Sequence, residues 1–479
     1  MLRIFNTLSE KKEKLAISKN RPVRLFVCGP TVYDYPHIGN ARTFMAFDII
    51  VRYLRSEGYN IFYLQNITDI DDKIIIKAKE EKTSWKATAK KYEKIFYRNL
   101  KDLNITSVDK FARATDYIPE ILKQVKTLIK KKYAYKIPGD GWYFDLKTFP
   151  DYGKLAHRTV GQAEDGVSRI DASDKKRNAG DFALWKFSHT NSTPPPKGSD
   201  NAKAPMRIYE PSWPTDLGDG RPGWHIEDTA ISESFFGSQY DLHGGALDLK
   251  FPHHEAEIAQ QESASGKKPF VKIWMHAGFL EVNGQKMSKS LGNFITINSL
   301  LKKYSADIFR MIILAHHYRS PINYTENSAK QAKTELQNLN NFIVRLSLIK
   351  KRGILSRALK ISIKKTDSAF QIAMEDDFNT PDALAAIFQL THEIEPRLWS
   401  LNQTEAKTVK NLITQKMGVF GINFQKIEKN PLKIKQLAKE RELYRTNKQF
   451  TQADALRKKI EKLGYHIEDT PVGPLILKK

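Results

Sequence analysis

The 479-residue sequence contains a single cysteine, Cys28, and no long apolar run. One thiol cannot form an internal disulfide framework, and scarce cysteine is typical of a reducing compartment. No window approaches the length of about 20 apolar residues that a membrane-spanning helix needs. The opening segment MLRIFNTLSEKKEK lacks an apolar core followed by small residues, so we expect no secretory signal. These absences favour a cytoplasmic protein with no membrane partner.

Acidic residues are outnumbered: 54 Asp and Glu stand against 78 Lys and Arg, which gives a formal charge of +24. Residues 331–479 hold 27 basic and 16 acidic residues, a net charge of +11 in under a third of the chain. A basic surface is typical of proteins that bind RNA phosphates. A generally lysine-rich composition produces the same numbers, so charge alone leaves both explanations open.

The first 320 residues alternate short apolar runs with helical patterns. Residues 25–28 and 61–64 have the apolar character of buried strands, and apolar residues recur at helical spacing over 44–54. Strand, helix and strand in this order predict a parallel α/β unit, whose ligands bind beyond the carboxyl ends of the strands. The polar, proline-rich segment 188–206 is expected to be an exposed loop.

The chain changes character after about residue 324. Apolar residues at helical spacing over 336–346 and 384–388 predict a helical bundle, and a charged, helix-rich segment begins at Pro431. A chain of this length is expected to form several domains. We predict a parallel-sheet domain with an inserted region at about 115–225, a helical bundle and a small C-terminal domain, over residues 1–320, 321–430 and 431–479.

The tetrapeptide His37-Ile38-Gly39-Asn40 lies between the first predicted strand and a helix expected to begin near Ala41. The N-terminus of a helix offers unpaired N–H groups and the positive end of a dipole, and both favour phosphate binding. Gly39 leaves room for a close ligand, and His37 can donate a hydrogen bond to a phosphate oxygen. An ordinary turn with Asn40 as the helix N-cap explains the same residues equally well.

A second motif, Lys286-Met287-Ser288-Lys289-Ser290, follows a strand-like segment and a turn at Asn283-Gly284. Two lysines three residues apart would stabilise the charge that develops on a departing pyrophosphate. A solvated basic loop is the alternative in so lysine-rich a chain. The two motifs, in this order and about 250 residues apart, resemble the paired ATP site of class I aminoacyl-tRNA synthetases.

Further segments resemble the cysteinyl-tRNA synthetase family in particular. The resemblance runs in register from about Ile4 to the C-terminal tail, interrupted mainly by the loop at 188–206. It implies a Rossmann-type catalytic domain with an inserted connective region, followed by a helical bundle and a C-terminal anticodon-binding domain. It also implies an enzyme that activates L-cysteine with ATP and loads it onto tRNA(Cys). The segments are Cys28–Asp34, Asn66–Lys73, Gly223–Glu227, Phe251–Glu257 and Asp376–Leu384.

In that family four residues bind a zinc ion, which binds the thiolate of the substrate cysteine. By resemblance the first ligand is Cys28, and the third and fourth are His253 and Glu257, on one face of a helix after Pro252. The second ligand is normally a cysteine, but this chain has Asp228. Aspartate binds zinc but is a harder ligand than thiolate, so we expect a lower zinc affinity. Recognition of cysteine by the same residues without metal is the alternative.

The resemblance assigns roles to the other site residues by position. The catalytic contacts to the phosphates, with Mg²⁺ accompanying ATP, fall to His37, Asn40, Lys286 and Lys289. Alanine at 246 replaces a glycine usual in the stretch His243–Asp248, over which the family lays adenosine. ATP contacts are expected from Gly39, Asp248, Lys289 and Ser290, and contacts to cysteine from Cys28, Thr68, Trp224 and His253. Candidates for tRNA contact are Arg445, Lys448 and Arg457, for which solvated helix charges are the alternative.

Two competing functions remain open. A ligase of the same catalytic fold that joins cysteine to a small amine would need no anticodon-binding region. This chain continues about 150 residues past the catalytic part, with helical and basic character. A non-catalytic RNA-binding relative would be expected to have eroded ATP motifs, and both motifs are present here. The expected oligomeric state is a monomer.

Overall fold

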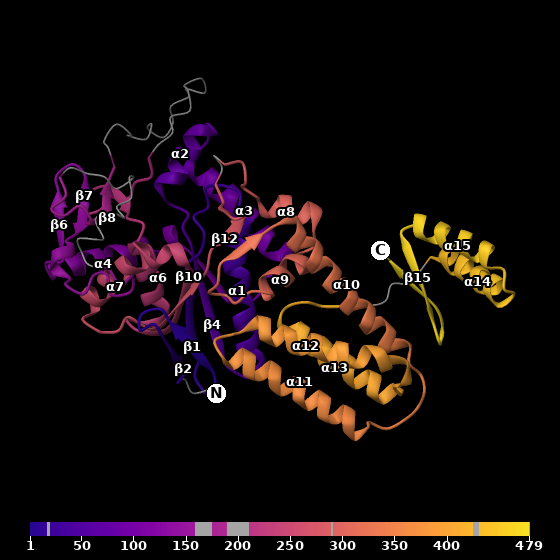
Figure 1. Ribbon diagram of the computed structural model, residues 1–479. Helices are drawn as coiled ribbons and strands as arrows, with labels where there is room; N and C mark the ends of the chain where they lie inside the picture. The colour runs from indigo at the N-terminus through magenta and orange to yellow at the C-terminus, as the bar shows by residue number, and fades with distance from the viewer. Residues whose placement is uncertain (17–19, 159–174, 189–209, 289–290, 425–430, 479) are drawn as a thin grey trace. The chain divides into compact units, whose positions relative to one another are not determined.

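The computed structural model describes residues 1–16, 20–158, 175–188, 210–288, 291–424 and 431–478. These residues form two compact units, shown in Figure 1. Most of the predicted loop 188–206 lies outside the described residues, and so do Lys289 and Ser290. Among the described residues, no helix is both long and apolar enough to span a bilayer. The first unit comprises Met1–Ala329 and Ala373–Thr380, and the second comprises Lys330–Ile372 and Pro381–Lys479.

A five-stranded parallel sheet lies at the centre of the first unit, with the strand order β11-β10-β3-β4-β5. From β3 the chain adds β4 and β5 on one side of the sheet, and it later adds β10 and β11 on the other side. The direction of winding therefore reverses between β3 and β10, and doubly wound sheets bind ligands at such a switch point. The sheet confirms the predicted Rossmann-type class. Its strands are β3 (Val23–Val27), β4 (Ile61–Ile67), β5 (Lys110–Arg113), β10 (Tyr240–Ala246) and β11 (Val271–Ala277).

Helix α1 (Ile38–Ser56) joins β3 to β4 and contains the predicted helical pattern at 44–54. It begins earlier than the expected Ala41, because the N-cap is His37 rather than Asn40. The other helices of the first unit are α2 (Asp72–Glu80), α3 (Trp85–Asp102), α4 (Ile118–Lys130), α6 (Ile226–Phe236), α7 (His253–Ser265), α8 (Ile297–Lys303) and α9 (Ala306–Leu314).

The region between β5 and β10 contains a separate antiparallel sheet of four strands. These strands are β6 (Ala134–Ile137), β7 (Gly141–Phe144), β8 (Phe182–Phe187) and β9 (Gly220–Pro222). An N-terminal hairpin and a three-stranded sheet complete the unit, with β1 (Arg3–Asn6), β2 (Lys11–Lys14), β12 (Leu280–Val282), β13 (Gln285–Lys286) and β14 (Ile322–Tyr324). Asn283 and Gly284, both at positive φ, form the predicted turn between β12 and β13.

The second unit is mainly helical. Its last two helices and a β-hairpin share a small apolar core that includes Ile434, Leu437 and Ile460. The elements from β14 onwards are α10 (Glu326–Leu348), α11 (Arg357–Glu375), α12 (Thr380–Ile394), α13 (Gln403–Val419), α14 (Leu432–Thr446), α15 (Phe450–Lys462), β15 (Tyr465–Thr470) and β16 (Gly473–Lys478). The helical bundle predicted after residue 324 is confirmed.

A buried ion pair holds α1 against α9. The side chains of Asp48 and Arg310 are fully buried, and Arg310 Nη1 donates to Asp48 Oδ2 over 2.9 Å. Arg310 Nη2 donates to the carbonyls of Leu103 and Asn104, while Asp48 Oδ1 accepts from the backbone N–H of Ser107. The pair therefore joins α1, α9 and the loop after α3, and it holds in place the helix that begins at the predicted phosphate-binding motif.

Asp48→Ala should destabilise the first unit strongly, because it leaves the Arg310 charge buried without a carboxylate. We expect a loss of about 3–5 kcal/mol, measured as the shift of the denaturant midpoint for this unit. Glu80→Ala is the matched control, since it removes an exposed pair with Lys77 and should cost about 0.5 kcal/mol or less. Equal shifts for the two variants would show that the buried pair does not anchor α1.

Candidate active site

Two cavities of about 270 and 370 Å³ open at the carboxyl ends of β3 and β10. Cys28, Gly29, His37, Asn40, Ala246, Asp248 and Leu249 line both, so the cavities are parts of one cleft. Cys28 directly follows β3, and its N–H donates to the carbonyl of Gly244 in β10 over 3.0 Å. The cleft therefore lies at the topological switch point, where space for a small molecule and a nucleotide is expected.

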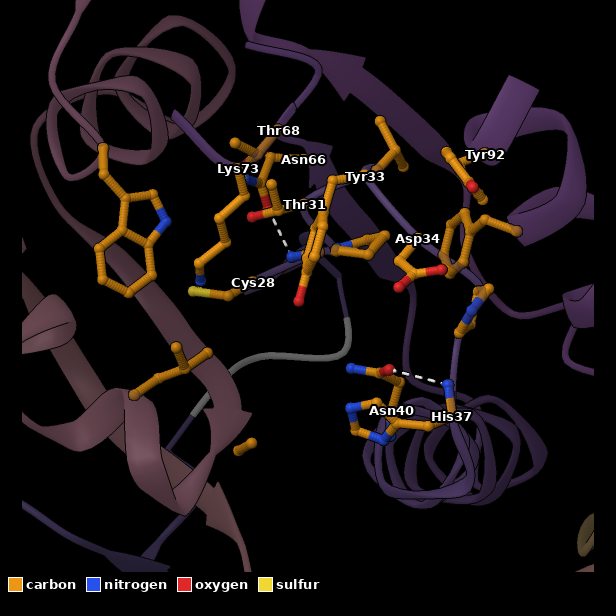
Figure 2. A pocket seen from close by; sticks show the side chains of 18 of the residues that line it. Cys28, Thr31, Tyr33, Asp34, His37, Asn40, Asn66, Thr68, Lys73 and Tyr92 are labelled. Atoms are coloured by element: carbon orange, nitrogen blue, oxygen red, sulfur yellow. Dashed lines mark hydrogen bonds between the residues drawn. The ribbon is translucent and has the colours of Figure 1, made fainter. Parts of the chain in front are cut away.

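The first motif forms the N-terminus of α1 at the edge of the cleft (Figure 2). His37 Nδ1 accepts hydrogen bonds from the backbone N–H groups of Gly39 and Asn40, and Asn40 Oδ1 accepts from the N–H of His37. Because Nδ1 is an acceptor, the neutral imidazole carries its proton on Nε2. A Cβ on Gly39 would lie 2.9 Å from the His37 ring, so this glycine makes room for the capping imidazole itself.

The second motif begins beside the first. Lys286 is exposed at the end of β13 and lines the cleft together with Met287, His37 and Gly39. The chain after the motif pairs with the first motif, because the N–H of Ile38 donates to the carbonyl of Ile295 over 3.0 Å. The structure thus brings the two motifs, far apart in sequence, to one end of the cleft. Of the predicted phosphate contacts, Lys289 and Ser290 lie outside the described residues.

The four predicted metal ligands also come together. One ligand atom from each of Cys28, Asp228, His253 and Glu257 lies within 4.8 Å of the others, and all four side chains are buried. His253 Nε2 is 3.0 Å from Asp228 Oδ2 and 3.0 Å from Glu257 Oε1. Glu257 Oε2 is buried with no hydrogen-bond partner, and His243 Nε2 lies 3.5 Å from it. A donor set of sulfur, nitrogen and carboxylate oxygen fits a divalent cation such as zinc.

Burial and the neighbouring charges shift the pKa values of the side chains in this cluster. Burial raises the pKa of the Cys28 thiol well above its usual value, and the Glu257 carboxylate raises it further. Burial also raises the pKa of Glu257, to about 7, although His253 opposes the shift. Burial alone would lower the pKa of His253, but Glu257 and Asp228 outweigh it and raise that pKa to about 9. The cluster is therefore an acidic pocket that favours positive charge.

The predicted walls of the cysteine pocket lie around this cluster. The Trp224 ring stacks on the His253 imidazole with a centroid distance of 4.4 Å, so it covers the cluster where the cleft begins. Thr68 follows β4 and donates to Glu227, and Asn66 Nδ2 donates to Thr68 Oγ1 over 3.3 Å. Figure 2 shows Thr68 and Asn66 on the side of Cys28, away from His37 and Asn40.

The chain is similar to known proteins over nearly its whole length. Residues 14–334 match the model of the tRNA synthetases class I (C) catalytic domain, and residues 369–425 match the DALR domain. The cysteine–tRNA ligase of Thermococcus gammatolerans is 39% identical over 98% of both chains, and that of Thermoplasma volcanium is 40% identical over 97% of both. This chain belongs to the cysteine–tRNA ligase family. The class I relationship predicted from the two motifs is confirmed.

Solved structures of other synthetases share the fold. Mycobacterium tuberculosis methionyl-tRNA synthetase in complex with methionyl-adenylate has a TM-score of 0.62 at 18% identity, covering 84% of this chain and 90% of that one. Agrobacterium radiobacter leucyl-tRNA synthetase, solved in a ternary complex, has a TM-score of 0.60 at 11% identity and covers 83% of each chain. At these identities the likeness shows the fold of the class I family and not the amino acid that is bound.

Three further histidines, His243, His254 and His276, are buried beside the cluster, a position that the sequence alone did not predict. His243 belongs to the stretch expected to receive adenosine, yet its Nε2 lies 3.3 Å from Cys28 Sγ. His254 Nε2 lies 3.0 Å from the same sulfur, and His276 Nε2 lies 2.8 Å from His254 Nδ1. The double histidine 253–254 was the available signal, because adjacent helix residues point about 100° apart and only one of them faces the cleft.

Asp248 and Lys448 are exposed, whereas Arg445 and Arg457, the other two candidates for tRNA contact, are half-buried. Asp248 belongs to a short helical turn after β10 and lines both cavities. Arg445 in α14 pairs with Asp469 over 3.1 Å, so part of its charge is already matched. Arg457 in α15 approaches Glu461 at 3.7 Å, and exposed Lys448 lies between the two helices at positive φ. These contacts fit the alternative of ordinary helix charges as well as they fit RNA binding.

Hydrogen bonds of Asn66 in β4 connect the cluster to the central sheet, and a substitution at Asn66 tests these contacts. Its Oδ1 accepts from the N–H of Gly29, and its Nδ2 donates to Asp228. Asn66→Asp should remove that donor and place a carboxylate against Asp228, which lowers the free energy of unfolding by about 2 kcal/mol or more. Thermal unfolding would measure the loss. Asn60→Asp, at an exposed asparagine before β4, should change stability by about 0.5 kcal/mol or less, and an equal effect would contradict the assigned contacts.

Proposed function

We propose that this chain is a cysteine–tRNA ligase that activates L-cysteine with ATP and esterifies it to the 3′ end of tRNA(Cys). The observation that carries the proposal is the cleft, where the two ATP motifs lie at one end and a thiol–imidazole–carboxylate cluster at the other. In the first step the cysteine carboxylate attacks the α-phosphate of ATP, forming cysteinyl-adenylate and releasing pyrophosphate. In the second a terminal ribose hydroxyl of the tRNA attacks the adenylate carbonyl and releases AMP.

The proposed chemistry needs positioning and charge stabilisation rather than a side-chain nucleophile. His37 donates from Nε2 to a phosphate oxygen, since its Nδ1 accepts the capping hydrogen bonds, and Asn40 supports it by closing the cap. Lys286 and Lys289 neutralise the phosphates, assisted by Mg²⁺ that accompanies ATP. ATP also contacts Gly39 and Ser290, and the Asp248 carboxylate accepts from its ribose hydroxyls.

The proposed amino-acid pocket is the cluster itself. Zinc held by Cys28, Asp228, His253 and Glu257 would supply a coordination bond that favours sulfur over the hydroxyl of serine. Trp224 stacks on His253 and closes one side of the pocket, and Thr68 lies at another side. The convergence of four buried ligand atoms within 4.8 Å, together with a Glu257 oxygen that has no hydrogen-bond partner, supports a bound metal over recognition without one.

The proposed tRNA-binding region follows the catalytic domain. We assign residues 1–320 to catalysis, with a connective region at about 115–225, then 321–430 to the helical bundle and 431–479 to anticodon binding. The net charge of +11 over residues 331–479 supports an RNA partner. Arg445, Lys448 and Arg457 are the proposed contacts. We also propose that the protein is a monomer and that it is located in the cytoplasm.

Pyrophosphate exchange with L-cysteine, followed by aminoacylation of tRNA(Cys), tests the whole proposal. A ligase of this kind should catalyse cysteine-dependent exchange and transfer the cysteine to tRNA. Exchange without transfer, combined with formation of a cysteinyl amide from a small amine, would favour the amine ligase. Absence of exchange at saturating cysteine and ATP would leave only the RNA-binding relative.

Substitutions at His37 separate its capping role from its phosphate role. Asparagine is an equally good N-cap, so His37→Asn should keep the stability of α1, whereas His37→Ala should lose about 1 kcal/mol. Both should lower the exchange rate by about 10²-fold or more, because both remove the Nε2 donor. Thermal unfolding and exchange kinetics on the same preparations measure the two effects. Near-normal exchange in His37→Asn would assign the residue to capping alone.

Metal content tests the zinc assignment directly. Carefully purified protein should contain about one equivalent of zinc, and chelation should abolish cysteine-dependent exchange. Asp228→Cys restores a thiolate, so zinc affinity in a competition titration should rise by about tenfold or more. Asp216→Cys, at an exposed aspartate in the inserted region, is the control and should leave the affinity unchanged. Metal-free wild-type protein with full exchange activity would contradict the zinc assignment.

A further inference from the structure

Cys28 and Glu257 belong to two possible ligand sets rather than one. The first set, with Asp228 and His253, is the one proposed above. The second combines Cys28 and Glu257 with His243 and His254, and its four ligand atoms also lie within 4.8 Å of one another. All side chains of both sets are buried. We call the first set the cleft set, because Cys28, Asp228 and His253 line the cleft, and the second the inner set, because His243 and His254 do not.

The two inner histidines have the surroundings of metal ligands. Each points Nε2 at the Cys28 sulfur and has its Nδ1 held by another side chain. His243 Nδ1 lies 2.6 Å from Tyr240 Oη, and His254 Nδ1 lies 2.8 Å from His276 Nε2. Such a partner on the second ring nitrogen fixes the tautomer and orientation of a ligating histidine. Metal-binding histidines in proteins almost always have one.

The hydrogen-bond network behind His254 runs through His276 to Thr7. His276 Nδ1 lies 2.9 Å from Thr7 Oγ1, so the hydroxyl can accept the His276 proton while His276 Nε2 accepts the His254 proton. This order of protons leaves a lone pair on His254 Nε2, facing Cys28. A Cβ on Gly245 would lie 2.7 Å from His254 Cε1, so the backbone of β10 is shaped to admit this ring.

The donor atoms of the two sets differ because of Asp228. The cleft set offers one sulfur, one imidazole nitrogen and two carboxylate oxygens, whereas the inner set offers one sulfur, two imidazole nitrogens and one carboxylate oxygen. Zinc is a borderline-soft cation that prefers sulfur and nitrogen to oxygen. Asp228 is also engaged as the acceptor for Asn66 Nδ2. With aspartate at this position, the inner set is the softer of the two.

We propose that Cys28, His243, His254 and Glu257 form a second metal site, which holds the ion while the cysteine pocket is empty. Since Cys28 and Glu257 belong to both sets, exchange between them replaces only two ligands. The thiol of L-cysteine would add a sulfur on the cleft side and draw the ion to the cleft set. This inference rests on the proposed zinc and deepens it by naming where the ion resides in the free protein.

X-ray absorption at the zinc edge of the full-length protein counts imidazole and sulfur ligands without reliance on activity. The free protein should have two imidazoles and one sulfur, and saturating L-cysteine without ATP should change this to one imidazole and two sulfurs. L-Serine should cause no change. One imidazole in the free protein would overturn the inference, and so would an unchanged count with L-cysteine. Absence of zinc would instead overturn the zinc assignment itself.

Three variants test the inference independently. His254→Gln removes an inner ligand and should weaken zinc binding in the free protein by about 100-fold or more, whereas Asp228→Asn should change it by less than about threefold. Asp228→Cys makes the cleft set the softer one, so its free form should have one imidazole. The opposite order of the first two variants, with zinc lost from Asp228→Asn and kept by His254→Gln, would mean that the inner histidines only donate hydrogen bonds to the thiolate.

Discussion

The site depends on the parallel pairing of β3 with β10. This pairing joins strands from the two halves of the winding, and it continues past β3 in the hydrogen bond from the N–H of Cys28 to the carbonyl of Gly244. Because the winding reverses there, helices leave the two strands in opposite directions and a crevice opens between them. Helix α1, with His37 at its N-terminus, starts on one side of that crevice, and α7 carries His253 and Glu257 on the other.

Ionisable side chains are concentrated where the protein excludes water. Three acidic or thiol side chains, those of Cys28, Asp228 and Glu257, converge with buried histidines, although the chain as a whole has a net charge of +24. Unpaired buried anions are costly, so such a cluster persists in evolved proteins when hydrogen bonds, a cation or a ligand compensates the charge. Hydrogen bonds from Asn66 and contacts with His253 supply part of this compensation, and one oxygen of Glu257 has no hydrogen-bond partner.

Aspartate in place of the second thiolate changes the donor atoms of the site but not the fold around it. Asp228 lies at the start of α6, and its neighbours in the cluster come from β4, from α7 and from the residue directly after β3. These elements are held by the sheet and by buried contacts, so one changed side chain leaves the backbone around it in place. What changes is the softness of one donor set relative to the other, and a small difference in donor chemistry decides where a metal ion resides.

Local patterns and short motifs were enough to predict the family and the parallel α/β class, and the resemblance to that family named Cys28, Asp228, His253 and Glu257 as candidate ligands. The turn at Asn283-Gly284 and the helix after Pro252 were predictable for the same reason: backbone preference and spacing act over a few residues. Only the tertiary structure placed His243 and His254 beside Cys28 and made His37 the cap of α1. Strand register and the facing of adjacent helix residues decide such contacts, and neither is a property of the residues alone.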